Sequence, residues 1–515
     1  MRLGDLLEGL EAVICRGDPS VEISDLAYDS RKVKPGSLFF AVPGLHLDGR
    51  QFAGQAVARG ARAVLSDSSV AFVPGAAMVQ VADVRQAMAR VAARFFGDPS
   101  RRLTLIGVTG TNGKTTFTYL MESILKEAGF RAGVIGTIQS RCGDRVYPSR
   151  QTTPEAVDLQ RTLHEMLEAG ATHALLEVSS HGLDYGRVDA CQFSCAVFTN
   201  LGRDHLDHHG SLESYFLSKA RLFTELLPCS EAAGRRPTAV VSREDPYGRR
   251  LIGMSRVPMV TVGSNGDSDY RIGTVACGRN GISVEVLTPG GALTLDSALL
   301  AEVNAQNIAL AAATADRLGI GREAIARGVA ALKRVPGRLE KVETERDLLV
   351  LIDYAHTPDA LEKVLAGLRK LAAARLITVF GCGGDRDRGK RPLMGAVTAS
   401  YSDLAVVTSD NPRSEPPERI IEEILQGVRA RGVPYLRPES VTSSWKGQKA
   451  HTAVADRRQA IRLALEAAAA GDIVLVAGKG HEGIQIVGGA ELPFSDRREV
   501  LEVLEGNKKG EKGLG

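Results

Sequence analysis

A glycine-rich turn at residues 109–116, Thr-Gly-Thr-Asn-Gly-Lys-Thr-Thr, carries residue types that can bind phosphate. Glycines let backbone N–H groups face an anion, and the start of a following helix adds partial positive charge. Lys114 could reach the terminal phosphates of a nucleotide, and the hydroxyl of Thr115 could bind Mg²⁺. The G-x-x-x-x-G-K-[ST] pattern requires glycine at position 108, where this chain has Val108. The turn predicts a nucleotide-phosphate site, and the alternative is an ordinary glycine-rich turn.

Acidic and histidine side chains follow two further apolar segments. Glu177 lies among apolar neighbours in a strand predicted to start at His173, where a carboxylate is costly unless it is paired or metal-bound. It could bind Mg²⁺ directly or through water. Residues 204–209, Asp-His-Leu-Asp-His-His, follow a predicted strand at 195–200. Ligand sites of α/β proteins lie beyond such strands, although a solvated polar loop is the alternative.

Four polar clusters follow four predicted strands in the last third of the chain. They are Asp353-Tyr354-Ala355-His356, Gly383-Gly384-Asp385-Arg386, Asp410-Asn411-Pro412-Arg413 and Gly478-Lys479-Gly480-His481-Glu482. Each could be a solvated loop by itself. Because the carboxyl ends of parallel strands meet at one edge of a sheet, the four clusters together predict a binding site.

The elements that position these residues alternate between strands and helices, which predicts an α/β fold. An apolar run at 103–108 reads as a buried strand, and residues 114–129 read as the amphipathic helix that follows it. Three domains are expected, at 1–100, 101–335 and 336–505. The first is a small α/β domain, the second has a mostly parallel sheet, and the third repeats strand–helix units. A polar tail at 506–515 is predicted to be disordered.

Composition limits the classes of protein to which the chain could belong. It has 515 residues, of which 44% are hydrophobic, and a net charge of +3 without a long basic run, so nucleic acid is not expected as a partner. Its seven cysteines are scattered without a zinc-site spacing. No signal core and no run of about 18 apolar residues is present, so no membrane insertion is expected. The chain is expected to be soluble, reduced and cytoplasmic.

Six motifs together resemble the Mur ligases of peptidoglycan synthesis, and among them the branch that adds meso-diaminopimelate. They are residues 110–116 (GTNGKTT), 177–182 (EVSSHG), 199–205 (TNLGRDH), 336–338 (PGR), 353–358 (DYAHTP) and 410–413 (DNPR). They occur in the family's order over nearly the whole chain. The resemblance implies an ATP-dependent ligase that joins meso-diaminopimelate to the D-glutamate of UDP-N-acetylmuramoyl-L-Ala-D-Glu through an acyl phosphate, releasing ADP and phosphate.

The resemblance also implies a domain for the UDP-muramoyl substrate, a central P-loop ATPase domain and a C-terminal Rossmann-like domain for the amino acid. Closure of these domains during turnover and a monomeric state are expected. The implied catalytic residues are Lys114, Glu177, His205 and Lys219. Lys219, to which the bare sequence gives no role, matches a lysine carbamylated by CO₂. Mg²⁺ would be held by Thr115, Glu177, His205 and this carbamate.

Substrate-binding residues are implied in the same way. ATP would be bound by Gly110, Thr111, Asn112, Gly113, Lys114, Thr115, Thr116, Asn304, Arg338 and Asp353. The UDP-muramoyl-dipeptide would be bound by Tyr28, Ser30, Leu45, His46, Leu47, Thr152, Thr153, Ser179, Tyr185 and Arg187. Diaminopimelate would be bound by Arg386, Asp410, Asn411, Pro412, Arg413, Gly478 and Glu482. Tyr185 departs from the family, because many relatives have glutamine there.

Two other interpretations remain open. One is a ligase of the same architecture that adds lysine, or that adds glutamate to folate, as folylpolyglutamate synthase does. The Asp410–Arg413 cluster argues against both, because an arginine there suits the second carboxylate that only diaminopimelate carries. The other is a regulatory ATPase without ligase activity, which the concentration of polar residues at three separate sites disfavours.

Overall fold

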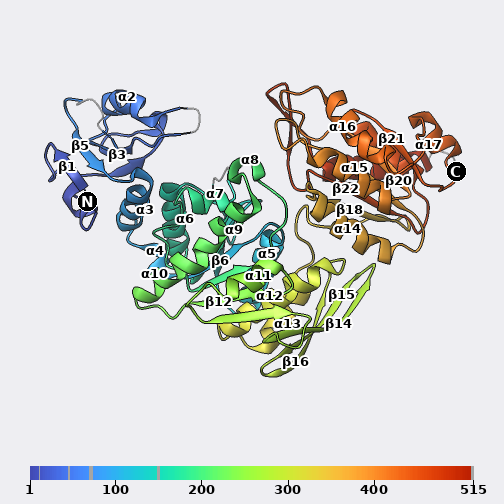
Figure 1. Ribbon diagram of the computed structural model, residues 1–515, viewed down its shortest axis with the longest axis horizontal. Coiled ribbons are helices and arrows are strands. Elements are labelled where there is room, and N and C mark those ends of the chain that lie inside the picture. The colour runs from blue at the N-terminus through green and yellow to red at the C-terminus, as the bar shows by residue number, and fades with distance from the viewer. Residues whose placement is uncertain (11, 45–46, 69–72, 148–150, 512–515) are drawn as a thin grey trace.

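A computed structural model describes residues 1–10, 12–44, 47–68, 73–147 and 151–511. Three sheets of five, eleven and six strands follow one another along the chain, with a separate two-stranded hairpin near its end. Figure 1 shows the N-terminal domain (blue) and the C-terminal domain (orange) at opposite ends of a central domain (green and yellow). The predicted α/β fold with three domains is therefore confirmed. Residues 100 and 335, the predicted ends of the first and second domains, lie in the segments that connect one sheet to the next.

The N-terminal sheet has the order β1-β5-β4-β3-β2, and only β1 is antiparallel to its neighbour. Its strands are β1 (Ala12–Arg16), β2 (Asp25–Ala27), β3 (Ser37–Phe40), β4 (Ala63–Ser66) and β5 (Ala77–Val81). Its helices are α1 (Leu3–Leu7), η1 (Ser30–Lys32), η2 (Gly49–Phe52), α2 (Ala53–Ala58), α3 (Val84–Phe95) and α4 (Pro99–Arg102). The apolar runs at 38–42 and 61–67 contain β3 and β4, which are buried throughout.

The central sheet has the order β16-β15-β14-β13-β12-β11-β6-β10-β7-β8-β9. Its parallel part comprises β6 (Thr104–Thr109), β7 (Ala132–Ile135), β10 (His173–Glu177), β11 (Cys195–Phe198), β12 (Thr238–Ser242) and β13 (Met259–Gly263). Because β6 lies between β10 and β11 in parallel register, the phosphate loop, Glu177 and the 204–209 segment all begin at the same edge. This is the placement that the sequence predicted.

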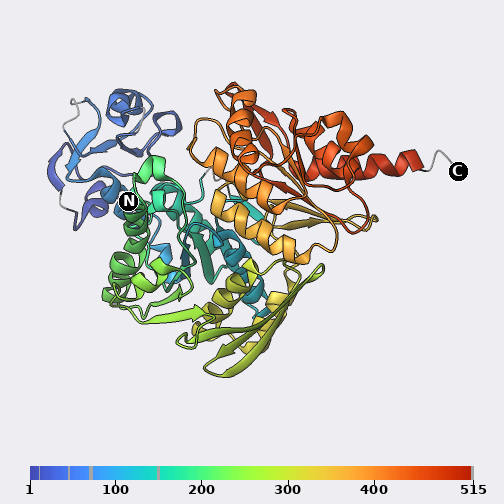
Figure 2. The same ribbon diagram turned by 45° about the vertical axis from the view of Figure 1, so that its right-hand side comes forward.

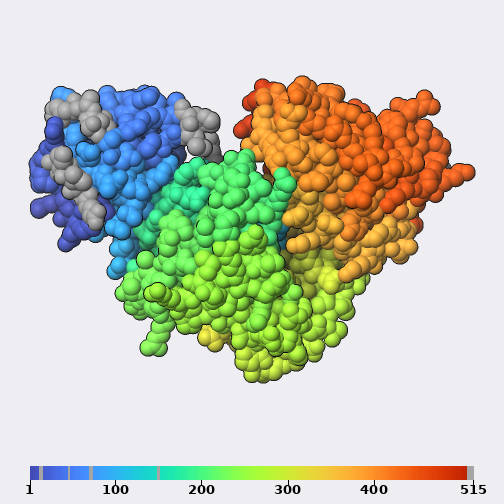
Figure 3. Space-filling view, viewed as in Figure 1, coloured from blue at the N-terminus to red at the C-terminus, as the bar shows by residue number. Residues whose placement is uncertain are grey.

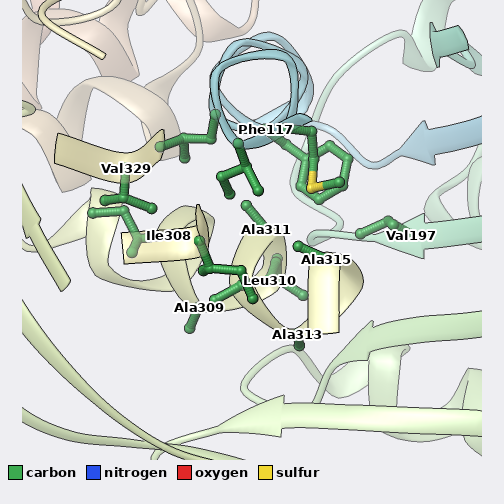
Figure 4. Close-up of a cluster of buried hydrophobic side chains, with 14 of the residues drawn as sticks. Phe117, Val197, Ile308, Ala309, Leu310, Ala311, Ala313, Ala315 and Val329 are labelled. Atoms are coloured by element: carbon green, nitrogen blue, oxygen red, sulfur yellow. The ribbon is translucent and has the colours of Figure 1, made fainter. Parts of the chain in front are cut away.

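Helices cover both faces of the central sheet. They are α5 (Lys114–Glu127), α6 (Ala156–Glu168), α7 (Ser180–Asp184), α8 (Leu206–His209), α9 (Leu212–Arg221), α10 (Leu227–Ala232), α11 (Pro246–Ile252), α12 (Val303–Arg317) and α13 (Arg322–Ala331). Figure 4 shows Phe117 of α5 with Ile308 and the alanines of α12 in one buried cluster. The small side chains of α12 let the two helices pack closely, so α5 is fixed behind the loop at its start.

An antiparallel extension of the central sheet was not predicted. It consists of β14 (Tyr270–Gly278), β15 (Gly281–Thr288) and β16 (Gly291–Ser297), which are antiparallel to one another, while β14 joins the sheet in parallel with β13. Figure 2 shows the extension at the lower edge of the molecule. A shorter antiparallel pair, β8 (Ser140–Cys142) and β9 (Arg145–Tyr147), ends the opposite edge. β15 alternates buried with less buried residues, which is the pattern of a half-buried strand, whereas β14 and β16 alternate less regularly and lack a long apolar run.

The C-terminal sheet has the order β17-β18-β22-β19-β20-β21 and is parallel except for β17. Its strands are β17 (Glu340–Val342), β18 (Leu349–Asp353), β19 (Leu376–Phe380), β20 (Leu404–Val407), β21 (Ala450–Ala453) and β22 (Ile473–Ala477). Its helices are α14 (Pro358–Leu371), α15 (Lys390–Tyr401), α16 (Pro417–Arg429), α17 (Pro438–Ser444), α18 (Arg457–Ala467) and α19 (Asp496–Glu511). The hairpin β23 (Ile484–Val487) and β24 (Ala490–Pro493) follows β22.

Two element boundaries depend on local detail, and one prediction needs correction. The strand from His173 ends at Glu177, because the Ser179 side chain accepts from the N–H of Gly182 and starts α7. A π-helical segment, η3 (Leu222–Leu226), lies between α9 and α10. Residues 506–511 of the predicted disordered tail continue α19, which extends to Glu511. Within the described residues, no helix has the length and apolarity needed to cross a membrane.

Candidate active site

The phosphate loop connects β6 to α5, and two of its positions require glycine. Gly110 has φ +146° and Gly113 has φ +89°, a range that side chains rarely adopt. A Cβ atom at Gly110 would lie 1.9 Å from the Thr199 hydroxyl, and one at Gly113 would lie 2.5 Å from Oδ1 of Asn307. The backbone therefore approaches its neighbours as closely as glycine permits.

Residues at the end of β11 hold this loop open. Asn200 Oδ1 accepts from the Asn112 N–H at 3.0 Å, while its Nδ2 donates to the Asn112 carbonyl at 3.2 Å. The Thr199 hydroxyl donates to the same carbonyl at 2.6 Å. These contacts position the loop before a ligand arrives, which lowers the cost of ordering it on binding.

Lys114, the first residue of α5, turns its side chain back over the loop. Its Nζ donates to the carbonyls of Gly110 at 2.8 Å and Thr111 at 3.1 Å. Burial lowers the pKa of Lys114, and the carboxylates of Glu177 and Asp204 oppose that shift. An anion in the loop would offer the ammonium a stronger acceptor than these carbonyls.

Glu177, at the carboxyl end of β10, is 1% exposed and faces the start of α5. Its carboxylate accepts from the Thr115 hydroxyl at 3.1 Å, the Thr137 hydroxyl at 2.8 Å and the Thr137 N–H at 3.2 Å. The predicted pairing of this buried carboxylate is therefore found, with hydroxyl and amide donors. The oxygen atoms of Glu177, Thr115 and Thr137 are the kind of ligands that Mg²⁺ prefers, so the residues fit such an ion.

A cleft of about 240 Å³ lies between the central and C-terminal domains. Most of the predicted nucleotide and metal residues line it: Thr111, Asn112, Gly113, Lys114, Thr115, Thr116, Glu177, His205, Asn304, Arg338 and Asp353. Arg338 places Nη2 3.5 Å from the Thr115 hydroxyl and stacks on the ring of Tyr354. Two domains thus contribute to one cleft.

Asp353 and Asn304 form opposite parts of the cleft wall. Asp353, at the end of β18, accepts from the N–H groups of Leu339 and Ala355, both at 2.7 Å. Burial raises the pKa of this carboxyl, and Arg338 and the two N–H donors oppose the shift. Asn304 Nδ2 donates to the Leu300 carbonyl at 2.7 Å.

Asp204 and His205 reach the cleft from the segment after β11. Burial raises the pKa of Asp204, but the neighbouring His356, His205 and Lys390 outweigh it and the net shift is downward. Burial also lowers the pKa of His205 to about 4, assisted by Lys219 and opposed by Asp204. His205 is therefore a neutral imidazole at pH 7, the form that can bind a metal ion.

Lys219, on α9, is 1% exposed and directs its amine towards the phosphate loop. Its Nζ donates to the Gly110 carbonyl at 3.0 Å and lies 4.5 Å from the centre of the Tyr215 ring. Burial, followed by the charge of Lys114, lowers the pKa of Lys219 well below its usual value. A lowered pKa increases the neutral fraction of the amine, which is the nucleophilic form.

The residues predicted to hold the muramoyl-dipeptide lie next to Glu177. The hydroxyls of Thr152 and Thr137 are 3.0 Å apart. Thr153 donates to the Glu177 carbonyl at 2.8 Å and to the Ser179 hydroxyl at 3.0 Å. Arg187 is anchored by the Thr153 carbonyl at 3.0 Å. The structure thus brings these predicted residues into one chain of contacts.

Tyr185, at a position where the resemblance implies glutamine in many relatives, lies between two arginines. The guanidinium of Arg85, on α3 of the N-terminal domain, is 4.7 Å from the centre of its ring, and that of Arg187 is 5.4 Å away. Glu155 pairs with Arg187 at 2.7 Å and with Arg85 at 3.8 Å. The tyrosine joins the N-terminal and central domains through cation–π contacts that a glutamine could not make.

The predicted uridine-binding residues are more dispersed. Tyr28 donates to Asp158 of α6 and lines a separate cavity of about 400 Å³ between the N-terminal domain and α6 of the central domain. The buried Ser30 donates to Gln55 at 2.8 Å. Leu47 is 67% exposed, and Leu45 and His46 lie outside the described residues. The structure does not bring these residues together in one described pocket.

Asn411 and Glu482, both predicted to bind the amino acid, meet at a buried lysine. Lys479 Nζ donates to Asn411 Oδ1 and to Glu482 Oε2, both at 2.9 Å, and Asn411 Nδ2 donates to Glu482 at 2.8 Å. The Tyr354 hydroxyl is 3.5 Å from Glu482, so this cluster shares a wall with the nucleotide cleft. A Cβ atom at Gly478 would lie 2.6 Å from Asp410.

Arg413 has φ +54°, a strained value for a residue with a side chain. The hairpin holds it there: its N–H donates to the Ile486 carbonyl at 3.0 Å, and its carbonyl accepts from Gly488 at 2.7 Å. Its Nη1 donates to the Gly384 carbonyl at 2.8 Å. Burial, with the charge of the exposed Arg386, lowers the pKa of Arg413. Two guanidiniums near each other favour an anionic ligand between them.

A buried arginine that the sequence did not single out connects the two loops of this site. Arg391 is fully buried and donates to Glu415 and Glu423, both at 2.7 Å, and to the Gly383 carbonyl at 3.2 Å. Glu415 in turn accepts from the N–H of Asp385 at 2.7 Å. The arginine therefore fixes the 383–386 loop against the segment after Arg413.

Arg391→Ala is expected to lower the free energy of unfolding by about 3 kcal/mol, because it removes the fully buried arginine that pairs with both Glu415 and Glu423. Among the described residues, Glu415 then keeps only the N–H of Asp385, whereas Glu423 keeps Arg388. Arg388→Ala is the matched control, since Arg388 pairs with Glu423 from the exposed surface and should cost less than about 1 kcal/mol. Urea denaturation measures both. Equal effects of the two substitutions would show that the buried network has no special role.

The sequence-based predictions either omitted several residues of the site or gave them no role. Asn200, Tyr354, His356 and Lys479 belong to strand-end motifs that the sequence did reveal, but their contacts depend on neighbouring strands. Thr137 follows the end of β7, and its position in that polar turn is the signal that could have identified it. Arg85 and Glu155 come from different domains, and no motif in the sequence around either residue marks it as part of the site.

Three models of Mur ligase domains match successive parts of the chain. Residues 22–96 match the family described as "Mur ligase family, catalytic domain". Residues 108–315 match the "Mur ligase middle domain", and residues 337–480 match the "Mur ligase, glutamate ligase domain".

Curated relatives are similar over their whole length. A protein of Geobacter sulfurreducens named UDP-N-acetylmuramoyl-L-alanyl-D-glutamate--2,6-diaminopimelate ligase is 46% identical, covering 99% of this chain and all of the relative. A protein of Geobacillus kaustophilus with the same name is 42% identical over 96% of this chain and 98% of its own length.

Solved structures show the same fold. One titled as a UDP-N-acetylmuramoyl-L-alanyl-D-glutamate--2,6-diaminopimelate ligase has a TM-score of 0.68 and 34% identity, covering 99% of both chains. MurF from Acinetobacter baumannii has a TM-score of 0.66 at 18% identity over 98% of both chains. Folylpolyglutamate synthase from Mycobacterium tuberculosis, complexed with ADP, has a TM-score of 0.61 at 18% identity, covering 76% of this chain and 92% of its own. The last two likenesses concern the fold alone.

Proposed function

The chain belongs to the Mur ligase family, and from this premise we propose that it joins meso-diaminopimelate to the D-glutamate of UDP-N-acetylmuramoyl-L-Ala-D-Glu with ATP. The observation that carries the proposal is the convergence of three sites. Thr137 links the Glu177 carboxylate to Thr152 on the muramoyl-dipeptide side. Tyr354 links the nucleotide cleft to Glu482 on the amino-acid side.

The proposed reaction has two steps. An oxygen of the D-glutamate carboxylate bonds to the γ-phosphorus of ATP, and the bond from that phosphorus to the β–γ bridging oxygen breaks, so ADP leaves. The amine of diaminopimelate, after losing a proton to solvent, then attacks the acyl carbon of the acyl phosphate. The carbon–oxygen bond to phosphate breaks, and the amide and inorganic phosphate are the products.

The protein's role in the first step is to bring two anions together. Lys114 and the N–H groups at the start of α5 would bind the phosphates, while Arg338 adds positive charge from the C-terminal domain. Mg²⁺ would be held by Thr115, Glu177, His205 and the Lys219 carbamate, and would supply further positive charge beside the γ-phosphate. Positioning and charge compensation, rather than acid–base chemistry, therefore account for the rate.

In the second step the C-terminal domain presents the amino acid. Asp410, Asn411 and Glu482 can accept from the two ammonium groups, and Arg386 and Arg413 can donate to the two carboxylates. Because Tyr354 lines the nucleotide cleft and its hydroxyl is 3.5 Å from Glu482, the amine needs only a short approach to the acyl phosphate. All these groups come from one chain, so we propose that it acts as a monomer.

We expect the reaction to take place in the cytoplasm, where ATP and UDP-linked precursors are kept. The cysteines at 142, 191, 195, 229, 277 and 382 are free thiols, the form usual in a reducing compartment. The direct test supplies the purified protein with ATP, Mg²⁺, UDP-N-acetylmuramoyl-L-Ala-D-Glu and a panel of amino acids. The expected result is phosphate release that depends on diaminopimelate, with one product whose mass equals the sum of the two substrates less water. Phosphate release without an amide product would indicate a regulatory ATPase, and a lysine adduct would indicate a lysine ligase.

Lys219 is expected to form a carbamate at neutral pH, because its lowered pKa leaves a larger share of the amine neutral and able to attack CO₂. The carbamate replaces a cation with an anionic oxygen ligand suited to Mg²⁺. Carbon-13 NMR of protein equilibrated with labelled bicarbonate should show one carbamate signal that is absent from Lys219→Ala.

The Lys219→Ala variant should also lose turnover by on the order of 100-fold, with partial recovery when a small carboxylate such as formate is added. Lys126→Ala, at the exposed end of α5, is the control and should leave both readouts unchanged. Wild-type protein without the carbamate signal, or normal turnover of Lys219→Ala without added carboxylate, contradicts the assignment.

A further inference from the structure

Four histidines gather beside the nucleotide cleft, and the proposed reaction uses only one of them. His181 stacks on His208 with ring centres 4.2 Å apart, and it lies 5.0 Å from His205 and 5.7 Å from His209. The rings of His208 and His209 are 4.7 Å apart. His181 belongs to α7, His208 and His209 to α8, and His205 precedes α8, so the cluster connects two short helices.

Two of these imidazoles direct ring nitrogens at one carboxylate oxygen. Asp184 Oδ2 lies 3.1 Å from His208 Nε2 and 3.3 Å from His209 Nδ1. One ligand atom from each of these three residues lies within 4.8 Å of the other two. Ligand atoms about 2.1 Å from a tetrahedral metal ion are about 3.4 Å from one another, so these spacings can accommodate an ion among the three.

The second nitrogen of His209 has its own partner. Its Nε2 is 2.9 Å from the Ser180 hydroxyl, and the Ser180 carbonyl accepts from Ser218 of α9 at 3.0 Å. A metal-binding histidine generally has its other ring nitrogen fixed by such a contact, which sets the direction of the free lone pair. Here Ser180 directs Nδ1 of His209 towards Asp184 and His208.

The site is open to solvent on one side. The side chains of Asp184 and His208 are 30% and 23% exposed, whereas that of His209 is 2% exposed. Figure 1 shows α8 at the top of the central domain, and Figure 3 shows a hollow above this domain, between the N-terminal (blue) and C-terminal (orange) domains. An ion could therefore enter without unfolding of the protein.

We propose that Asp184, His208 and His209 bind a divalent transition metal ion such as Zn²⁺, with water as a further ligand. Two imidazoles and one carboxylate suit Zn²⁺, Co²⁺ or Ni²⁺, whereas Mg²⁺ prefers oxygen ligands alone. The ion joins α7 to α8. Because His205 directly precedes α8 and lines the nucleotide cleft, the ion also restrains the segment that carries His205.

The test is a titration of the full-length, metal-free protein with Co²⁺ in millimolar Mg²⁺, followed by visible absorption and by calorimetry. We expect one Co²⁺ per chain, with the strong visible absorption of a four-coordinate ion and displacement by Zn²⁺. His208→Ala and Asp184→Asn should each weaken binding by on the order of 100-fold, and Ser180→Ala by on the order of tenfold.

Two control variants separate this site from other candidates. Glu177→Gln should bind Co²⁺ as the wild type does, because Glu177 belongs to the proposed Mg²⁺ site. His164→Ala removes a histidine that pairs with a single carboxylate, Glu168, and should also have no effect. Thermal melting of each variant shows whether it is folded, and a rise in wild-type Tm with Zn²⁺ is expected to disappear in His208→Ala.

Absence of tight Co²⁺ binding, or binding that is unchanged in both His208→Ala and Asp184→Asn, would overturn the proposal. Loss of binding in Glu177→Gln would also overturn it, because the ion would then belong to the nucleotide cleft. No substrate is present in these measurements, so their outcome is independent of the proposed ligase activity.

Discussion

A Lys114→Ala variant is expected to fold normally and to lose at least on the order of 1,000-fold in ligase turnover. The ammonium lies over the phosphate loop, where it donates to the carbonyls of Gly110 and Thr111. Its charge would offset the repulsion between the γ-phosphate and the substrate carboxylate. Removing one preorganised charge of this kind from a phosphoryl-transfer site typically costs a factor of 100 to 100,000.

Phosphate release and product mass are the measurements for this variant, with circular dichroism and thermal melting as the folding check. The two hydrogen bonds that Lys114 loses are each worth about 1 kcal/mol, so a folded protein is expected. Lys126→Ala tests whether any lysine on the same helix matters. Full ligase activity in a folded Lys114→Ala variant would remove Lys114 from the catalytic site.

Wild-type protein is expected to prefer meso-diaminopimelate over lysine by a hundred- to several-thousandfold in kcat/KM. The two amino acids share a long side chain that ends in an amine, and only diaminopimelate has a carboxylate beside that amine. With lysine bound, Arg413 would be partly desolvated and unpaired, at a cost of roughly 3–5 kcal/mol. At about 1.4 kcal/mol for each tenfold, this cost gives the expected preference.

Arg413→Ala should reduce that preference to within about tenfold, mainly by losing activity with diaminopimelate. Arg386→Ala is the matched control, because Arg386 is assigned to the carboxylate that both amino acids share and should weaken both alike. Equal use of lysine by the wild type, or an unchanged preference in Arg413→Ala, would contradict the assignment. A preference lost equally in Arg386→Ala would reverse the roles of the two arginines.

The sequence predicted the order of strands and helices around the site because long apolar runs and strand-end polar clusters are local signals. The loop at 109–116, Glu177 and the cluster after β20 lie at strand ends as expected. Local signals could not show which distant residue each side chain contacts. Thr137 reaches Glu177 only because β7 and β10 are neighbours, and Tyr354 joins two sites only because two domains meet there.

The dependence on contacts between distant segments also explains most of the other features that the sequence did not reveal. β15 carries the alternation of a half-buried strand, which is a usable signal, whereas β14 and β16 alternate too irregularly to be recognised by periodicity. Arg391 is a charged residue in a helix, which normally indicates solvent exposure, and only the positions of Glu415 and Glu423 make its burial possible. The histidine cluster also depends on the approach of α7 to α8, although His208 and His209 are adjacent in sequence.

The pairing of Arg413 with the β23–β24 hairpin has a consequence for protein engineering. Since the strained backbone of Arg413 is held by Ile486 and Gly488, about 75 residues further along the chain, the direction of its side chain is encoded in two separate segments. A redesign that replaces only residues 410–413 would remove the Arg413 side chain that is proposed to bind the ligand. It would keep the β23–β24 hairpin that holds the backbone at position 413. Grafting residues 410–413 and 484–493 as one cassette from a donor enzyme should transfer amino-acid selectivity, whereas either segment alone should give a chimera that discriminates poorly.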